Sequence, residues 1–185
     1  MTIKLYGLFL ILLHTLPLIA KGPAGIVLYS IYESETFLLL ADENDRRGWC
    51  GFGGGDEKGE NVVETAAREV EEETRRFFKK EWLKEQIKNQ KPLVYNGYSM
   101  FFLEIPFISA EKIQSFDLRE NESMVTSEKV NFAWVPCSEL KEAIETNSLQ
   151  SPAIKNIETS QTKFYWDIWF NGIKEAFQND SLPFS

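Results

Sequence analysis

The chain has 185 residues, the length of one ordinary domain, so an enzyme built from separate cofactor and substrate domains is not expected. Its 20 basic and 28 acidic residues give a net charge of −8, and such a surface repels the phosphates of nucleic acids. His14 is the only histidine, and Cys50 and Cys137 are the only cysteines, which excludes most zinc sites and most Ser-His or Cys-His catalysis.

The first 21 residues have a composition of their own. They contain two lysines, no acidic residue and an apolar run that ends at Ala20, which is the pattern of a secretory signal peptide. We therefore expect a signal peptide or apolar segment over residues 1–21 and a single domain over residues 22–185. Cleavage would give a secreted or periplasmic protein without stable membrane insertion; the alternatives are a membrane-anchored or a cytoplasmic protein. Export would also permit a disulfide between Cys50 and Cys137.

The domain opens with two strand-like segments and a glycine-rich stretch. Residues 25–32 and 36–41 are apolar runs of strand length, and the polar turn between them predicts a hairpin. Five of the eleven glycines then fall between Gly48 and Gly55, more than an ordinary loop needs. A glycine-rich turn before a helix lets the backbone approach a ligand closely and present N–H groups to phosphate. A tight connector is the alternative interpretation.

A helix is predicted from Asn61, whose side chain can cap a free N–H while Glu64 reaches back to the cap. Apolar or small residues follow at steps of three and four, at Val63, Ala66, Ala67, Val70, Thr74 and Phe77. Two layouts stay open. Either the helix runs well beyond Thr74, or it breaks near Arg75 and a second short helix continues through Lys88.

The second half of the domain mixes strands with helices. The pattern predicts strands over residues 93–96, 98–108 and 130–135, and helices over residues 110–116, 138–145 (capped by Ser138) and 162–177, with an acidic loop over residues 117–129. Strands mixed with helices in so short a chain predict a layered α/β sandwich with a mixed sheet.

Three carboxylates on the predicted helix carry the chemistry. Glu69, Glu72 and Glu73 lie at i, i+3 and i+4, and like charges at this spacing destabilise a helix by about 0.2–0.5 kcal/mol per pair. A divalent cation such as Mg²⁺ or Mn²⁺ would reverse that cost and bridge the carboxylates to substrate phosphates. Arg68 can orient Glu72 through an i, i+4 pair. The carboxylates alone leave open a solvated acidic helix face.

The glycines and the carboxylate helix together resemble the signature of the Nudix hydrolases, G-x5-E-x7-R-E-U-x-E-E-x-G-U, in which U is apolar. Seven of nine positions match: Gly54, Glu60, Arg68, Glu69, Val70, Glu72 and Glu73. Trp49 has the family's usual place before the glycines, and Phe132–Pro136 is similar to a later family strand. The departures are Arg75-Arg76 in place of the final glycine-apolar pair and Phe52 in place of a proline.

The resemblance implies a Nudix-type α/β/α sandwich with a mixed β-sheet and a metal-dependent pyrophosphohydrolase. It would cleave a nucleoside diphosphate linked to another moiety, as in nucleotide sugars, ADP-ribose, dinucleoside polyphosphates or nucleoside triphosphates. Glu69, Glu72, Glu73 and the carbonyl of Gly53 would hold Mg²⁺ or Mn²⁺. Glu69, Glu72 and Arg68 would be catalytic, with Arg68 bracing the glutamates.

Other roles follow from the same resemblance. Gly54, Gly55 and Glu60 would form the substrate-binding loop. The general base would be Glu69 or one of three glutamates of the acidic loop, Glu120, Glu122 and Glu128. Aromatic residues of the predicted strands, Tyr95, Tyr98, Phe101 and Phe102, would either stack on a nucleobase or belong to the core. A non-catalytic Nudix-fold module that binds a nucleotide or a protein is the alternative, and a homodimer is left open.

Overall fold

The computed structural model describes residues 20–43, 47–116, 129–155, 160 and 163–184. The elements in chain order are β1 (Ala24–Tyr32), β2 (Glu35–Glu43), β3 (Trp49–Cys50), β4 (Phe52–Gly54), α1 (Val62–Glu73), α2 (Lys80–Ile87), β5 (Leu93–Tyr95), β6 (Tyr98–Glu104), α3 (Ala110–Gln114), β7 (Lys129–Pro136), α4 (Cys137–Glu145), α5 (Pro152–Lys155) and α6 (Asp167–Gln178). In this part of the chain, none of the helices has the length and apolar character needed to cross a membrane.

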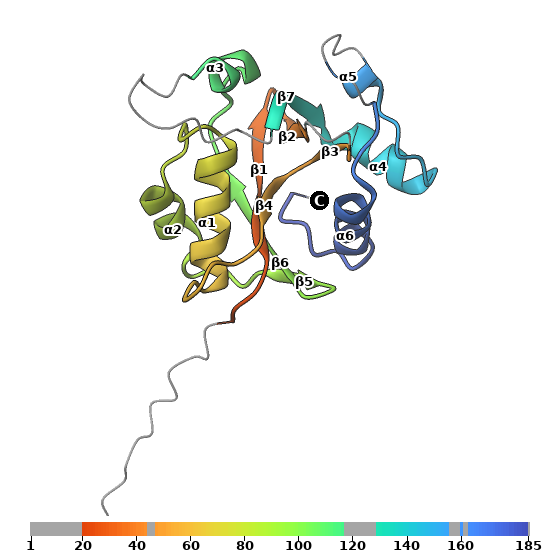
Figure 1. Ribbon diagram of the computed structural model, residues 1–185. Helices are drawn as coiled ribbons and strands as arrows, with labels where there is room; N and C mark the ends of the chain where they lie inside the picture. The colour runs from red at the N-terminus through yellow and green to blue at the C-terminus, as the bar shows by residue number, and fades with distance from the viewer. Residues whose placement is uncertain (1–19, 44–46, 117–128, 156–159, 161–162, 185) are drawn as a thin grey trace, which may run out of the picture.

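Strand β1 organises a mixed sheet (Figure 1). It pairs with β2 as the predicted antiparallel hairpin, with β4 antiparallel and with β6 parallel. β2 pairs in turn with β3 and β7, and β5 pairs with β6. The glycine-rich strand β4 is therefore held by the middle of the sheet at Ala24, Gly25 and Ile26.

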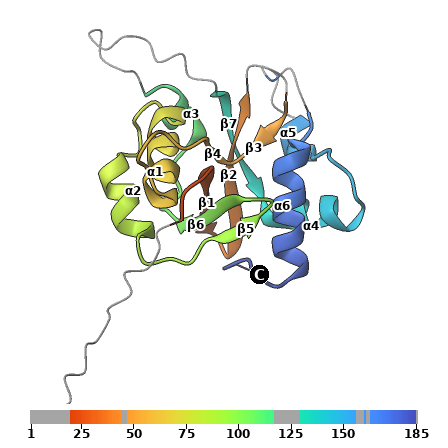
Figure 2. The ribbon, with the colours of Figure 1, turned by 60° about the horizontal axis from the view of Figure 1, so that its bottom comes forward.

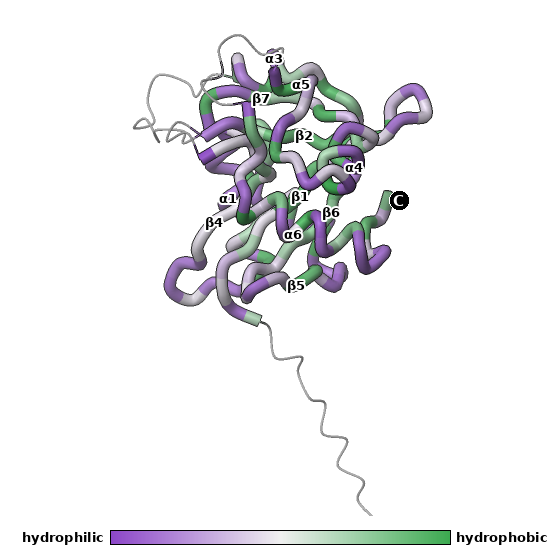
Figure 3. The backbone as a smooth tube through the Cα atoms, turned by 90° about the vertical axis from the view of Figure 1, so that its right-hand side faces the viewer, coloured by the Kyte–Doolittle hydropathy of each residue, from purple (hydrophilic) through white to green (hydrophobic). Residues whose placement is uncertain are grey.

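Helices cover both faces of the sheet, α1 and α2 on one and α4 and α6 on the other (Figures 1 and 2). Because side chains alternate along a strand, Ile26 and Leu28 of β1 pack in the cluster under α1 and α2, whereas Val27 packs in the cluster under α4 and α6. The hydrophobic colour in Figure 3 accordingly follows the central strands. The predicted α/β/α sandwich with a mixed sheet is confirmed.

Helix α1 begins and ends by local chemistry. The side chain of Asn61 accepts hydrogen bonds from the N–H groups of Val63 and Glu64, and the Glu64 carboxylate bonds back to Asn61, as the predicted capping box requires. The helix stops at Glu73, and Arg75 and Arg76 have left-handed φ angles of 55° and 61°. Of the two layouts, the break near Arg75 is the one found.

The departure from the family signature falls in this left-handed turn. A glycine takes a positive φ without steric cost, whereas an arginine does not. Nη1 of Arg75 donates to the carbonyl oxygen of Gln114 at 2.6 Å, which ties this turn to the end of α3. The arginine pair therefore lies in the turn after the helix, outside the helix that carries the glutamates.

Three local predictions are wrong. Helix α6 begins at Asp167 and not at residue 162, because Phe164 and Tyr165 pair as isolated bridges with Gln150 and Trp49. Helix α4 has no side-chain cap, since the Ser138 hydroxyl donates to Glu35 at 2.9 Å instead. Strand β6 ends at Glu104, four residues early; Pro106 follows closely and has no N–H to continue the ladder.

The two cysteines are both buried and free. The disulfide that export would have permitted is therefore not formed in this structure.

Candidate active site

The glycine strand β4 lies directly against helix α1. The N–H of Gly53 donates to Oε2 of Glu73 at 2.8 Å. A methyl group at position 54 would lie 2.7 Å from the carboxylate atoms of Glu69, and Gly53 has a φ of +153°. Position 54 needs glycine because the Glu69 carboxylate approaches the backbone too closely for a side chain, and position 53 needs it because a side chain there would meet the Tyr98 hydroxyl and the backbone of Ala24 and Gly25.

Arg68 holds three glutamates together. Its Nε lies 3.0 Å from Glu60, its Nη2 lies 2.9 Å from Glu69 and its Nη1 lies 3.0 Å from Glu72. Nη2 also donates to the carbonyl oxygen of Gly55 at 2.7 Å. The planar guanidinium can serve all of these acceptors at once, which a lysine cannot do. The contacts of Arg68 therefore fit the predicted role of a residue that holds the glutamates in position.

Glu73, the third predicted ligand, has partners other than Arg68. Its side chain is buried, and Oε1 lies 3.4 Å from Nζ of Lys129, which is only 1% exposed. The same ammonium lies 2.7 Å from Glu43 and 3.0 Å from Sγ of Cys50. Burial raises the pKa of Glu73, while the Lys129 ammonium and the Gly53 N–H act against that rise. The glutamates of α1 therefore belong to two groups: Glu69 and Glu72 contact Arg68, and Glu73 contacts Lys129.

Lys129 was not predicted as a site residue, although a signal was present in the sequence. It is the first residue of β7, and alternate positions from Lys129 to Val135 face the buried side of the strand. A lysine in register with an inward-facing strand pattern must find acidic partners, because a buried unpaired ammonium is very costly.

The expected divalent cation would need carboxylate oxygens that lie close to one another. Among the residues that the structure describes, no group of three His, Cys, Asp or Glu side chains is gathered closely enough to hold a metal. The expected cluster of three carboxylates is therefore not preformed. Mg²⁺ commonly takes one or two carboxylates and completes its shell with waters and phosphates. Glu69 and Glu72, which both contact the Arg68 guanidinium, could supply these two carboxylates. The ligand roles of Glu73 and of the Gly53 carbonyl stay predictions.

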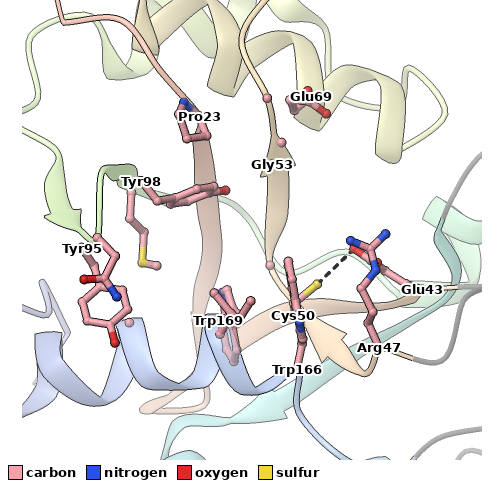
Figure 4. A pocket seen from close by; sticks show the side chains of 17 residues that line it. Pro23, Glu43, Arg47, Cys50, Gly53, Glu69, Tyr95, Tyr98, Trp166 and Trp169 are labelled. Carbon is pink, nitrogen blue, oxygen red and sulfur yellow. Dashed lines mark hydrogen bonds and ion pairs between the residues drawn. The ribbon is translucent and has the colours of Figure 1, made fainter.

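A cavity of about 450 Å³ adjoins this group (Figure 4). Glu69 and the backbone of Gly53, Gly54 and Gly55 line one end, whereas Glu60, the third residue of the predicted substrate-binding loop, is not among the lining residues. Aromatic side chains from β5, β6 and the start of α6 line the rest of the wall, namely Tyr95, Tyr98, Trp166 and Trp169, and the Tyr98 hydroxyl lies beside Gly53. The cavity thus joins a carboxylate and glycine end to an aromatic end.

The predicted aromatic residues divide between cavity and core. Tyr95 and Tyr98 line the cavity, whereas Phe101 and Phe102 pack within or against the two hydrophobic clusters. Trp166 and Trp169, within the terminal helix predicted over residues 162–177, were not predicted as site residues. Their sequence spacing gives no sign that they lie near β4, more than 100 positions earlier in the chain.

Several predicted residues lie outside the described part of the chain. They include Glu120, Glu122 and Glu128, so their role as general base stays a prediction. The same holds for the signal peptide, of which only Ala20 and Lys21 are described. Glu69 is the candidate base that the structure places at the cavity.

Substituting Gly54 by alanine should displace the Glu69 carboxylate, because the added methyl would lie 2.7 Å from all three of its carboxylate atoms. A catalytic group misplaced by about 1 Å can cost about a hundredfold in rate, and we expect a loss of that size in kcat. Gly55→Ala is the matched control, since nothing lies within 4 Å of a methyl at that position. Steady-state kinetics of both variants checks this; equal losses would contradict it.

The ionisation of Glu60 makes the stability of the folded protein depend on pH. Burial alone would raise the pKa of Glu60, but the hydrogen bond and charge of Arg68, with smaller help from the Glu57 N–H and Lys80, lower it to about 2. The folded pKa lies below the ordinary value of 4.5, so this stabilisation is present above pH 4.5 and is lost as the pH falls toward 2. We expect it to contribute about 2 kcal/mol after solvent screening.

Urea denaturation of the wild type and Glu60→Gln at pH 7, 4 and 2.5 measures this contribution. The difference in unfolding free energy between the two proteins should shrink as the pH falls. A difference that stays constant over this range would show that the charge of Glu60 does not stabilise the loop.

The model of the NUDIX domain family matches residues 22–156 of this chain. The chain therefore belongs to the Nudix family of hydrolases. A crystal structure titled as a C. elegans Ap4A hydrolase binary complex is similar, with 20% identity, a TM-score of 0.43, and coverage of 66% of this chain and 83% of that chain. A mutT/nudix family protein from Listeria innocua shows 14% identity, a TM-score of 0.41, and coverage of 87% and 96%. No curated protein matches the chain.

Proposed function

We propose that the chain is a metal-dependent pyrophosphohydrolase that cleaves a nucleoside diphosphate linked to another moiety. The observation that supports this most strongly is the single cavity that joins Glu69 and the glycine backbone to an aromatic wall. Its volume of about 450 Å³ is that of an ordinary small-molecule site. The diphosphate would lie at the glycine end, and a planar base would lie at the aromatic end.

The residues of α1 would hold Mg²⁺ or Mn²⁺ through Glu69 and Glu72. When bound, such a cation neutralises diphosphate charge and lowers the pKa of a coordinated water. Arg68 fixes the orientation of both carboxylates, since each lies within 3.0 Å of its guanidinium. Glu69, which lines the cavity, would accept the proton of an attacking water.

The aromatic end would select the substrate. Stacking of a base on an aromatic side chain contributes about 1–3 kcal/mol in nucleic-acid complexes. The guanidinium of Arg47 lies 5.2 Å from the centre of the Trp166 ring and its Nε lies 2.7 Å from Glu43, so the Trp166 ring is held in place. Tyr95 and Trp169 add further apolar surface to the same wall.

Trp166→Ala should raise KM by about tenfold and leave kcat nearly unchanged, because the ring contacts a part of the substrate that does not react. The matched control is Trp82→Ala, which removes an exposed tryptophan outside the cavity lining. Kinetics with the preferred substrate checks this; an unchanged KM would place the base elsewhere.

The function itself is tested by a turnover screen with Mg²⁺ and Mn²⁺, with mass detection of both products. The panel contains nucleotide sugars, ADP-ribose, dinucleoside polyphosphates and nucleoside triphosphates. Metal-dependent cleavage of a phosphoric anhydride bond is the expected result. Binding across the panel without turnover would instead favour the non-catalytic nucleotide-binding module.

A further inference from the structure

The segment that carries Trp166 is tied to the sheet through its backbone. The N–H of Trp49 donates to the carbonyl oxygen of Phe164 at 2.8 Å, and the N–H of Trp166 donates to the carbonyl oxygen of Trp49 at 2.9 Å. Trp49 belongs to β3 and is fully buried. The cavity wall at Trp166 is therefore built on β3, although the two tryptophans are far apart in the sequence.

A buried side-chain contact lies beside this backbone pairing. The hydroxyl of Ser160 donates to Oδ2 of Asp42 at 2.8 Å and accepts from Nε1 of Trp49 at 3.3 Å. Nδ2 of Asn131 donates to the same carboxylate oxygen at 3.4 Å. Asp42 is 2% exposed and Ser160 is 7% exposed, so these bonds form where the dielectric constant is low and hydrogen bonds are stronger than at a surface.

Asp42 lies among three strands, opposite Trp49 of β3 and Asn131 of β7. Burial raises the pKa of Asp42, and the hydrogen bonds from Ser160 and Asn131 act against that rise. A buried carboxylate is a poor source of stability, because desolvation offsets what its partners contribute. Its partner from outside the sheet is Ser160, which lies beyond residue 156, where the family match ends.

Neither Asp42 nor Ser160 lines the cavity. Both can influence a bound nucleotide only through the segment that follows Ser160 in the chain and carries Trp166. The Arg47 guanidinium, 5.2 Å from the centre of the Trp166 ring, is a further neighbour of that ring (Figure 4). The ring thus depends on contacts made by residues that do not themselves meet the substrate.

We propose that Asp42 and Ser160 are positioning residues, whose hydrogen bond holds residues 163–166 on β3 and so places the Trp166 ring before a nucleotide binds. This inference rests on the proposed function, because it concerns the aromatic end of the same cavity. A ring that is in place for only part of the time binds its ligand with an apparent affinity reduced by that fraction.

Calorimetry with Mg²⁺ and α,β-methylene-ADP, whose bridge is not hydrolysed, tests the proposal without turnover. Ser160→Ala should weaken nucleotide binding by about fivefold, because the ring is in place for a smaller fraction of the time. In a Trp166→Ala background the same substitution should change the affinity by less than about twofold, since the ring through which Ser160 acts is absent. A loss of stability alone would not depend on Trp166 in this way.

Ser138→Ala is the matched control. Its hydroxyl also donates to a carboxylate, that of Glu35 at 2.9 Å, and neither residue lines the cavity. This variant should keep the nucleotide affinity of the wild type within about twofold.

Hydrogen exchange of the protein without nucleotide measures the position of the segment directly. The N–H groups of Tyr165 and Trp166 donate to the carbonyl oxygens of Leu149 and Trp49, both at 2.9 Å, and should exchange slowly in the wild type. Ser160→Ala should speed their exchange by at least about fivefold, the size expected when one buried hydrogen bond is lost. Ser138→Ala should leave their exchange unchanged.

Three results would overturn the proposal: unchanged exchange of these two amides in Ser160→Ala, a loss of affinity that is as large in the Trp166→Ala background as in the wild type, or no nucleotide binding by the wild type. The outcomes also separate the inference from the proposed function. A protein that shows the expected binding pattern and hydrolyses nothing in the panel leaves the inference standing and removes the function. Turnover with independent effects of Ser160→Ala and Trp166→Ala does the reverse.

Discussion

Glu72→Gln is expected to reduce kcat/KM by about a thousandfold or more, because metal-ion catalysis contributes several kcal/mol and each 1.4 kcal/mol is a factor of ten. The amide keeps the size of the carboxylate and can still accept a hydrogen bond from Arg68, which lies 3.0 Å away. The side chain is 43% exposed, so the fold should lose little stability. A large loss of activity without a loss of stability would therefore show that Glu72 acts in the chemistry and not in folding.

Kinetics at saturating Mg²⁺ and thermal denaturation of the same preparations give the two readouts. Glu71→Gln provides the comparison, because it removes one charge from the neighbouring position of α1. Full activity of Glu72→Gln, or an equal loss in both variants, would show that the helix contributes only its overall charge.

Arg68→Lys is expected to cause a loss of about 10- to 100-fold in kcat/KM. One guanidinium serves Glu60, Glu69, Glu72 and the Gly55 carbonyl, and a single ammonium cannot reach these acceptors together. The loss should be accompanied by weaker Mn²⁺ binding, because the two carboxylates lose their common orientation.

Arg75→Lys makes the same chemical change just after the C-terminal end of α1. There the guanidinium donates to the carbonyl oxygen of Gln114 and not to the glutamates. It should leave Mn²⁺ affinity unchanged. An Arg68→Lys enzyme with the kinetics and Mn²⁺ affinity of Arg75→Lys would mean that Arg68 does not position the carboxylates.

The sequence predicted well the parts of the fold whose causes are local. The capping box of Asn61 and Glu64 lies within four residues, and the β1–β2 hairpin is set by a short turn between two apolar runs. The spacing of Arg68, Glu69 and Glu72 likewise places three side chains on one helix face. Each of these depends on backbone geometry that neighbouring residues fix.

The features of the fold and the site that the sequence did not predict depend on packing between segments that are distant in the chain. Lys129 meets Glu43 and Glu73 across 86 and 56 positions, so no local pattern could show that Glu73 turns away from Glu69. Part of the aromatic wall of the cavity, Trp166 and Trp169, lies at the start of α6, beyond residue 156, where the family match ends. The break after Thr74 was undecided because the charge pattern suited a longer helix equally well.

The most direct measurement is anomalous diffraction from Mn²⁺ in crystals of the wild type grown with α,β-methylene-ADP. We expect a manganese peak within coordination distance of Glu69 and Glu72, with the diphosphate beside Gly54 and the base against Trp166. A peak away from both of these glutamates, or a nucleotide bound outside the cavity, would contradict the proposed function.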